Sequence, residues 1–301
     1  MRNKLLIALG ISLSLSSCKF DDEEVTYGTT SVYILNQDYN RNLVVGEGLE
    51  LKVGVILAGL VSNHENRSVN YVIDPSIITA DTVTEMPAGY YTVGDKQSIH
   101  IPEGELKGYL TVKLDSAAFL ADPKALTGEY ILPVKLTTAS GIDKVNADMN
   151  YIRVSVSYFA KQHGNYQYHG TRTANGISEA YENNPTETNS FRLLQTAGPR
   201  KMQVIADTKA ATDPAKDTYS FYVEVATKGG GEVTITPIPG APVQVQPVGT
   251  STYDEATKTF SLNYSYTVNN VTYTIAETLV FRNRIRDVQA NGLYLNEWRG
   301  F

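Results

Sequence analysis

Residues 259–281, TFSLNYSYTVNNVTYTIAETLVF, constrain the fold more than any other stretch of the chain. Apolar and polar residues alternate in two arms around Asn269 and Asn270, which predicts a β-hairpin with a two-residue type I′ turn. The turn sets the register and predicts these facing pairs on one side: Val268 with Val271, Tyr266 with Tyr273, Tyr264 with Ile275, and Phe260 with Leu279. The opposite side carries Ser, Thr, Asn and Ala, so one face of the hairpin is expected to be buried and the other wet.

Glu277 interrupts the apolar face of this hairpin, opposite Leu262. A carboxylate in such a place needs a partner, because burying an unpaired charge is costly. One interpretation makes Glu277 a ligand contact inside a barrel. The favoured one pairs it with Arg282, Arg284 or Arg286.

The fold class predicted is all-β. Residues 28–158 contain about seven short alternating segments separated by turns, which favours an immunoglobulin-like antiparallel β-sandwich. Residues 164–301 contain longer hairpins, which favour an antiparallel lipocalin-like barrel, closed or open. Pro133 predicts that its strand lies at an edge or carries a bulge, and Ser116 to Leu120 is expected to form one short helical turn.

Residues 1–17 have the layout of a secretory signal peptide: Arg2 and Lys4, then an apolar run, then small residues. Leu15-Ser16-Ser17-Cys18 resembles the bacterial lipobox, so Cys18, the only cysteine, is expected to be lipidated. Residues 18–27 then form an acidic tether, and acids directly after such a cysteine resemble the surface-export signal of Bacteroidetes lipoproteins. The expected location is the outer membrane, with the protein lipid-anchored and facing the cell exterior.

Charge and cysteine content restrict the possible partners and bonds. Loss of the leader takes the formal charge from −6 to −8, 24 basic against 32 acidic residues. Nucleic acid is therefore not an expected partner, since its binding needs a basic patch. One cysteine allows no internal disulfide, so the core alone must hold the fold.

No catalytic residue, metal site or cofactor is predicted. The four histidines are scattered, and the Gly-x-Ser-x-Gly pattern of serine hydrolases is absent. Glu103 and Glu105 are a close carboxylate pair, but PEGELKG reads as a turn with solvated acids. The acids of DTKAATDPAKD are too widely spaced for a calcium loop.

Clusters of aromatic and polar side chains are the candidate glycan-binding residues, because rings stack on sugars while amides and charged groups bond the hydroxyls. One cluster is Tyr90 and Tyr91 in AGYYTV. The other is in the tail LYLNEWRGF and contains Tyr294, Asn296, Trp298 and Arg299. A plug that closes the barrel is the favoured alternative for Trp298, and the tyrosines of GNYQYHG are expected to be framework residues.

Several stretches resemble a known pair of domain families. SVYILNQ, YTVGDKQSIHIPEGELKGYLTVKL and GEYILPVKLTTASG resemble the β-sandwich domain of unknown function at the front of Bacteroidetes surface lipoproteins. GNYQYHGT, YDEATKTFSLNYSY and ETLVFRNR resemble the C-terminal domain that often follows it. The resemblance covers framework positions and carries over no catalytic residue. It implies a surface-exposed accessory protein, glycan-binding or adhesive.

Two functions follow as expectations. The first is a non-catalytic accessory lipoprotein of a polysaccharide-utilisation system, which binds an oligosaccharide or polysaccharide near an outer-membrane importer or surface hydrolase. The alternative is an adhesion or scaffolding lipoprotein that binds another protein at the outer membrane.

Overall fold

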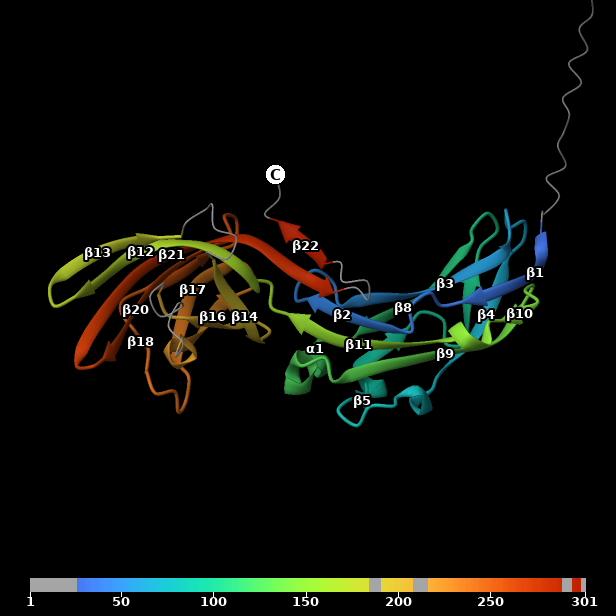
Figure 1. Cartoon of the computed structure of the whole chain (residues 1–301), viewed down its shortest axis with the longest axis horizontal. Helices are drawn as coiled ribbons and strands as arrows, with labels where there is room; N and C mark the ends of the chain where they lie inside the picture. The colour runs from blue at the N-terminus through green and yellow to red at the C-terminus, as the bar shows by residue number, and fades with distance from the viewer. Residues whose placement is uncertain (1–25, 184–190, 208–215, 289–293, 299–301) are drawn as a thin grey trace, which may run out of the picture.

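The computed structural model describes residues 26–183, 191–207, 216–288 and 294–298. Two β domains lie end to end, and β1 begins at the end of the first domain that is remote from the second (Figure 1). The one α-helix of the described residues is α1 (Ser116–Ala121), where a helical turn was predicted, and the side chain of Asp115 caps its first turn. In the part of the chain that the structure describes, no helix is both long and apolar enough to cross a bilayer.

The first domain is a sandwich of two sheets, as predicted. Sheet A has the order β10 (Lys144–Val145), β1 (Thr26–Tyr33), β3 (Glu50–Leu60), β8 (Lys107–Leu114) and β6 (Tyr91–Val93). Sheet B has the order β2 (Asp38–Val44), β11 (Tyr151–Phe159), β9 (Tyr130–Ser140), β4 (Arg67–Ile73) and β7 (Ser98–Ile101), with β5 (Thr84–Glu85) beside β9. The pairing is mainly antiparallel, but β2 runs parallel to β11, β1 to β10, and β5 to β9.

The apolar faces of the two sheets form one core. The alternation that was predicted for 49–57, 106–114 and 151–158 places every second residue inside, and the residues between them are at least partly exposed, except the buried Ser157. Members of this core with almost no exposure include Val55, Val112, Leu132 and Val156.

The prediction for Pro133 was an edge strand or a bulge. The strand does carry a register shift against β4, between Leu136 and Ala139, but it is not an edge strand. This strand, β9, lies inside sheet B between β11 and β4. The strand tolerates the proline because β4 ends at Ile73, which pairs with Val134, and the next residue, Asp74, donates its backbone N–H to the carbonyl of Pro133. The hydrogen-bond ladder between β4 and β9 therefore ends at the position where Pro133, which has no N–H, could not donate.

The second domain is a closed eight-stranded antiparallel barrel. Its strands follow the order β12 (Gly164–Ala174), β14 (Arg192–Gly198), β15 (Lys201–Ile205), β16 (Ser220–Thr227), β17 (Gly230–Pro237), β19 (Ser251–Asp254), β20 (Thr259–Val268) and β21 (Val271–Val288). Pairing of β21 with β12 closes the ring, and this settles the choice between a closed and an open barrel. The remaining strands, β13 (Ile177–Glu182), β18 (Gln246–Pro247) and β22 (Tyr294–Trp298), pair with β12, β20 and β21 respectively.

The hairpin prediction is confirmed in register and in facing. All four predicted pairs occur between β20 and β21, and Asn269 and Asn270 have φ of 51° and 61°, as the type I′ turn requires. Tyr266 is 5% exposed, and Tyr273 packs half-buried against the same core, with the two rings stacked at 5.3 Å.

The two domains are joined by direct contacts around the short linker after β11. Arg284 donates to the carbonyl oxygens of Lys161 and His163, at 2.8 and 3.0 Å, and lies 3.5 Å from the carboxylate of Glu47 in the sandwich. The ring of His163 stacks on Phe159 with a centroid distance of 3.9 Å. Burial and the charge of Arg284 lower the pKa of His163 to about 4, so this histidine is neutral in the folded protein.

Candidate functional site

The barrel interior holds a buried polar cluster around Glu277. The hydroxyls of Tyr264 and Tyr181 donate to its two carboxylate oxygens at 2.8 and 3.1 Å, and Arg192 lies 3.5 Å from it. The side chains of Glu277 and Arg192 are 0% and 2% exposed. The predicted partner was therefore wrong: Arg192, on β14, takes the place assigned to Arg282, Arg284 or Arg286.

The pKa shifts within this cluster are those expected for an internal ion pair. Burial alone would lower the pKa of Arg192, but the neighbouring charge of Glu277 raises it above its ordinary value. Burial, followed by the charge of Glu277, raises the pKa of Tyr264 well above its ordinary value. Arg192 and Glu277 thus form an ion pair inside the barrel, and apolar and aromatic side chains fill most of the remaining interior.

A second carboxylate, Asp207, is fully buried nearer the β20–β21 turn. It accepts a hydrogen bond from the hydroxyl of Tyr266, and Arg172 lies 3.6 Å from its other oxygen. The backbone N–H of Asp207 donates to the hydroxyl of Tyr264 at 2.9 Å, which links the two clusters. Both clusters use their polar groups to hold barrel strands together.

The sandwich, by contrast, has an open edge. Strand β3 pairs with β8 along Glu50–Ile56, but β1 accompanies it only from Ile56 onward. Strand β2 pairs with β11 alone. Within the described residues, β2 and the Leu51–Gly54 stretch of β3 therefore each keep one unpaired edge, and between them lies a groove of about 160 Å³.

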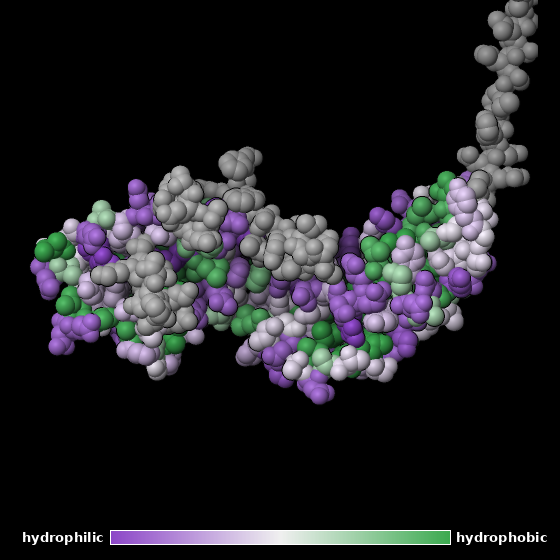
Figure 2. All heavy atoms as spheres, viewed as in Figure 1, coloured by the Kyte–Doolittle hydropathy of each residue, from purple (hydrophilic) through white to green (hydrophobic). Residues whose placement is uncertain are grey.

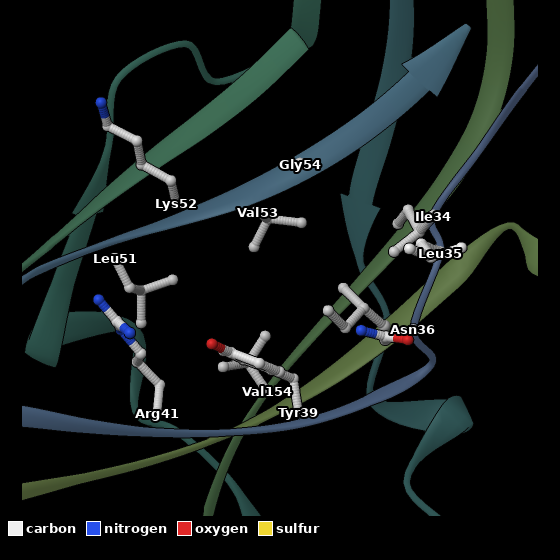
Figure 3. Close-up of a pocket in the computed structure, with 11 residues that line it drawn as sticks. Ile34, Leu35, Asn36, Tyr39, Arg41, Leu51, Lys52, Val53, Gly54 and Val154 are labelled. Carbon is white, nitrogen blue, oxygen red and sulfur yellow. The ribbon is translucent and has the colours of Figure 1, made fainter. Parts of the chain in front are cut away.

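The groove has an apolar floor and a polar rim (Figure 3). Leu51 and Val53 point into it from β3, and Tyr39 and Arg41 point into it from β2, while Lys52 points away on the opposite side of β3. Asn36 lies at one end, on the exposed connection between β1 and β2. The arrangement of one ring, one amide and one guanidinium around an apolar floor suits a small ligand that has both apolar and hydroxyl-bearing faces.

The predicted glycan-binding residues lie elsewhere. Tyr90 packs in the sandwich, where its ring meets Phe119 and Tyr130 edge-on and its hydroxyl donates to Asp122 at 2.9 Å. Tyr91 begins β6 and packs half-buried against the same core. Both rings therefore pack against the core of the sandwich, and neither lines the groove.

The remaining predicted residues are described only in part. Tyr294, Asn296 and Trp298 lie on β22, which pairs with the end of β21, but their side chains are outside the described residues. Arg299 and Cys18 are also outside them. Among the described residues, no group of three or more His, Cys, Asp or Glu side chains could hold a metal ion.

Sequence reasoning missed the groove residues Tyr39 and Asn36, and also Tyr109 on the outer face of β8. The outward position of Tyr109 could have been predicted from the sequence. The apolar alternation of 106–114 places Tyr109 on the face opposite Leu110 and Val112, so a large ring was predictable on an outward face. Tyr39 had no such signal, because DYNRNLV is too polar to be recognised as a strand.

Comparisons with known proteins agree on the architecture. One family model, for an N-terminal domain, matches residues 24–143, and another, for a C-terminal domain, matches residues 154–280. A structural-genomics protein of unknown function from Bacteroides ovatus shares the fold, with a TM-score of 0.67 and 20% identity over 91% of this chain and 98% of that one. No curated protein matches the chain.

A more distant similarity is to an auxiliary nutrient binding protein from Bacteroides thetaiotaomicron, with a TM-score of 0.44 and 16% identity over 83% of this chain and 92% of that one. None of these matches is named for a catalysed reaction. The two family models together span most of the described chain. The chain therefore belongs to the family whose N-terminal domain, here the β-sandwich, precedes the C-terminal domain that is here the β-barrel.

Proposed function

We propose that this protein is a non-catalytic accessory protein that binds a glycan nutrient at the cell surface, and that the groove between β2 and β3 receives the sugar. The observation that carries the proposal is the ring of Tyr39 beside Asn36 and Arg41 over an apolar floor. A sugar has apolar C–H faces that stack on such a ring and hydroxyls that bond amides and guanidinium groups. The barrel, whose charges are paired inside, serves as a rigid support.

The proposed location follows from the leader. A lipid on Cys18 would tether the chain eight residues before β1, which begins at the end of the sandwich remote from the barrel (Figure 1). The groove would then lie between the anchor and the barrel and be open to solvent. A partner such as an outer-membrane importer or surface hydrolase would take the glycan onward.

The proposal is tested by measuring polysaccharide binding with affinity gels and calorimetry. Asn36→Ala and Tyr39→Leu should each weaken binding, by about tenfold for the lost ring. Asn40→Ala is the matched control, because Asn40 is exposed on the same strand but does not line the groove. Binding that survives both groove variants, or a protein that retains no polysaccharide at all, would refute the proposal.

One observation favours the second candidate, an adhesion or scaffolding protein. The unpaired edge of β3 at Leu51–Gly54 offers backbone groups that an added strand of a partner protein could pair with. On the face seen in Figure 2, apolar residues are interspersed with polar ones in separate patches, so that view shows no broad apolar docking area. Capture of a surface protein that tolerates Tyr39→Leu and competes with no glycan would select this function.

A further inference from the structure

The outer face of sheet A carries positive charge around an exposed ring. Along β8, Lys107, Tyr109, Thr111 and Lys113 alternate with residues buried in the core. Beside them, β3 places Gly54 opposite Tyr109 and Lys52 opposite Thr111. Because neighbouring strands lie about 4.8 Å apart and alternate residues about 6.8 Å apart, these side chains share one compact surface. It meets the groove along the open edge of β3.

The ring of Tyr109 leans over Gly54. A Cβ built on Gly54 would lie 3.3 Å from the Cε1 atom of Tyr109, so the ring occupies the space that a side chain at position 54 would take. Tyr109 is nevertheless 55% exposed. Gly54 has no positive φ that would require glycine. Its role here is to let an aromatic ring lie against an outward-facing sheet while more than half of the residue's surface stays open to a ligand.

Two of the three lysines on this face lack an acidic partner in the described part of the chain. Among the described residues, neither Lys52 nor Lys107 has a carboxylate within 4.0 Å, and Lys113 reaches Glu50 only at 3.9 Å. The other acid close in sequence, Glu105, belongs to the turn before β8. The chain as a whole has a formal charge of −6, whereas this sheet face has an excess of lysine and therefore a positive local charge.

We infer that the glycan is an anionic polysaccharide, which crosses the edge of β3 and lies on this face. A sugar ring stacks on Tyr109, while acidic groups of the flanking units pair with Lys52 and Lys107. The inference rests on the proposed function, and it adds the chemical class of the ligand. Uronate carboxylates and sulfate esters present the same anionic chemistry, so the experiment includes both.

Binding of purified protein is measured against two pairs of polymers. Polygalacturonate and highly methyl-esterified pectin differ in their free carboxylates, and sulfated and unsulfated chondroitin differ in their sulfate esters. The variant with Lys52→Gln and Lys107→Gln should bind the more highly charged polymer of the preferred pair about tenfold more weakly than the wild type does. Raising the salt should weaken the wild type toward the same level, because exposed charges are screened. Lys124→Gln with Lys228→Gln, two exposed lysines elsewhere, is the control of equal charge.

The ring is tested separately. Tyr109→Ala should weaken binding of the favoured polymer, and Gly54→Thr should do the same while retaining the tyrosine, because the ring can no longer lie over position 54. Preference for polygalacturonate identifies a uronate ligand, and preference for sulfated chondroitin identifies a sulfated one.

Three results would overturn the inference. If both members of each pair bind equally and the lysine variant is unchanged, the ligand is neutral, and the groove variants then decide the proposed function alone. If no polysaccharide binds, the inference and the proposed function both fail. If phosphatidylglycerol vesicles bind through Lys52 and Lys107 and polysaccharides do not, the face is a membrane contact.

Discussion

The barrel pairs Arg192 with Glu277 out of contact with water, whereas the sandwich leaves Tyr109, Lys52 and Lys107 on an open face. Both domains are built from strands with the same alternation. In the barrel, β21 meets β12 and closes the ring of strands. In the sandwich, β3 runs past the end of β1 and leaves a groove. The comparison teaches that the polar groups of the barrel interior are held by one another, whereas those of the groove and of sheet A remain accessible to a ligand.

The largest expected effect comes from breaking the ion pair in the barrel. Glu277→Ala leaves Arg192 buried without its counter-charge, which should lower the free energy of unfolding by about 3–5 kcal/mol in urea denaturation. The double variant Arg192→Met with Glu277→Leu should recover most of that stability, because no buried charge remains. A single variant of normal stability that no longer binds glycan would instead make the barrel the ligand site.

A middle-sized effect is expected at the junction between the two domains. The pKa of His163 is lowered to about 4 in the folded protein, against an ordinary value of 6.5, so the unfolded chain binds the proton more readily. The stabilising contribution is complete above pH 6.5 and is lost as the pH falls toward 4. Between pH 7.5 and pH 5.0 this should cost about 2 kcal/mol.

The readout for His163 is urea denaturation at the two pH values. His163→Gln keeps a group that can accept from the backbone N–H of Thr196, which His163 does at 3.1 Å, but it does not titrate. The pH-dependent loss should therefore be smaller in the variant by about that same 2 kcal/mol. An identical loss in both proteins would show that His163 does not control it.

The smallest expected effect is in the turn of the β20–β21 hairpin. Asn270 has a φ of 61°, which glycine adopts at lower cost, and Asn-Gly is the preferred type I′ pair. Asn270→Gly should raise the melting temperature slightly and leave glycan binding unchanged, since the turn belongs to the closed barrel. A clear fall in melting temperature would contradict this description of the turn.

Local pattern was sufficient to predict much of the fold. The hairpin from Thr259 to Phe281 was predictable in register because the Asn269-Asn270 turn and the apolar alternation act within one short stretch. The partner of Glu277 was not predictable, since Arg192 lies 85 residues earlier and meets it only through barrel closure. The groove was missed for a similar reason: the polar strand β2 forms only by parallel pairing with β11, more than one hundred residues away.

Hydrogen–deuterium exchange with and without an anionic polysaccharide tests the central claim most directly. The account predicts slower exchange in three places, the β1–β2 connection with β2, the open edge of β3, and β8 around Tyr109, with no change in the barrel strands. Protection confined to β12, β14 and β21, around Arg192 and Glu277, would contradict it and would place the ligand inside the barrel.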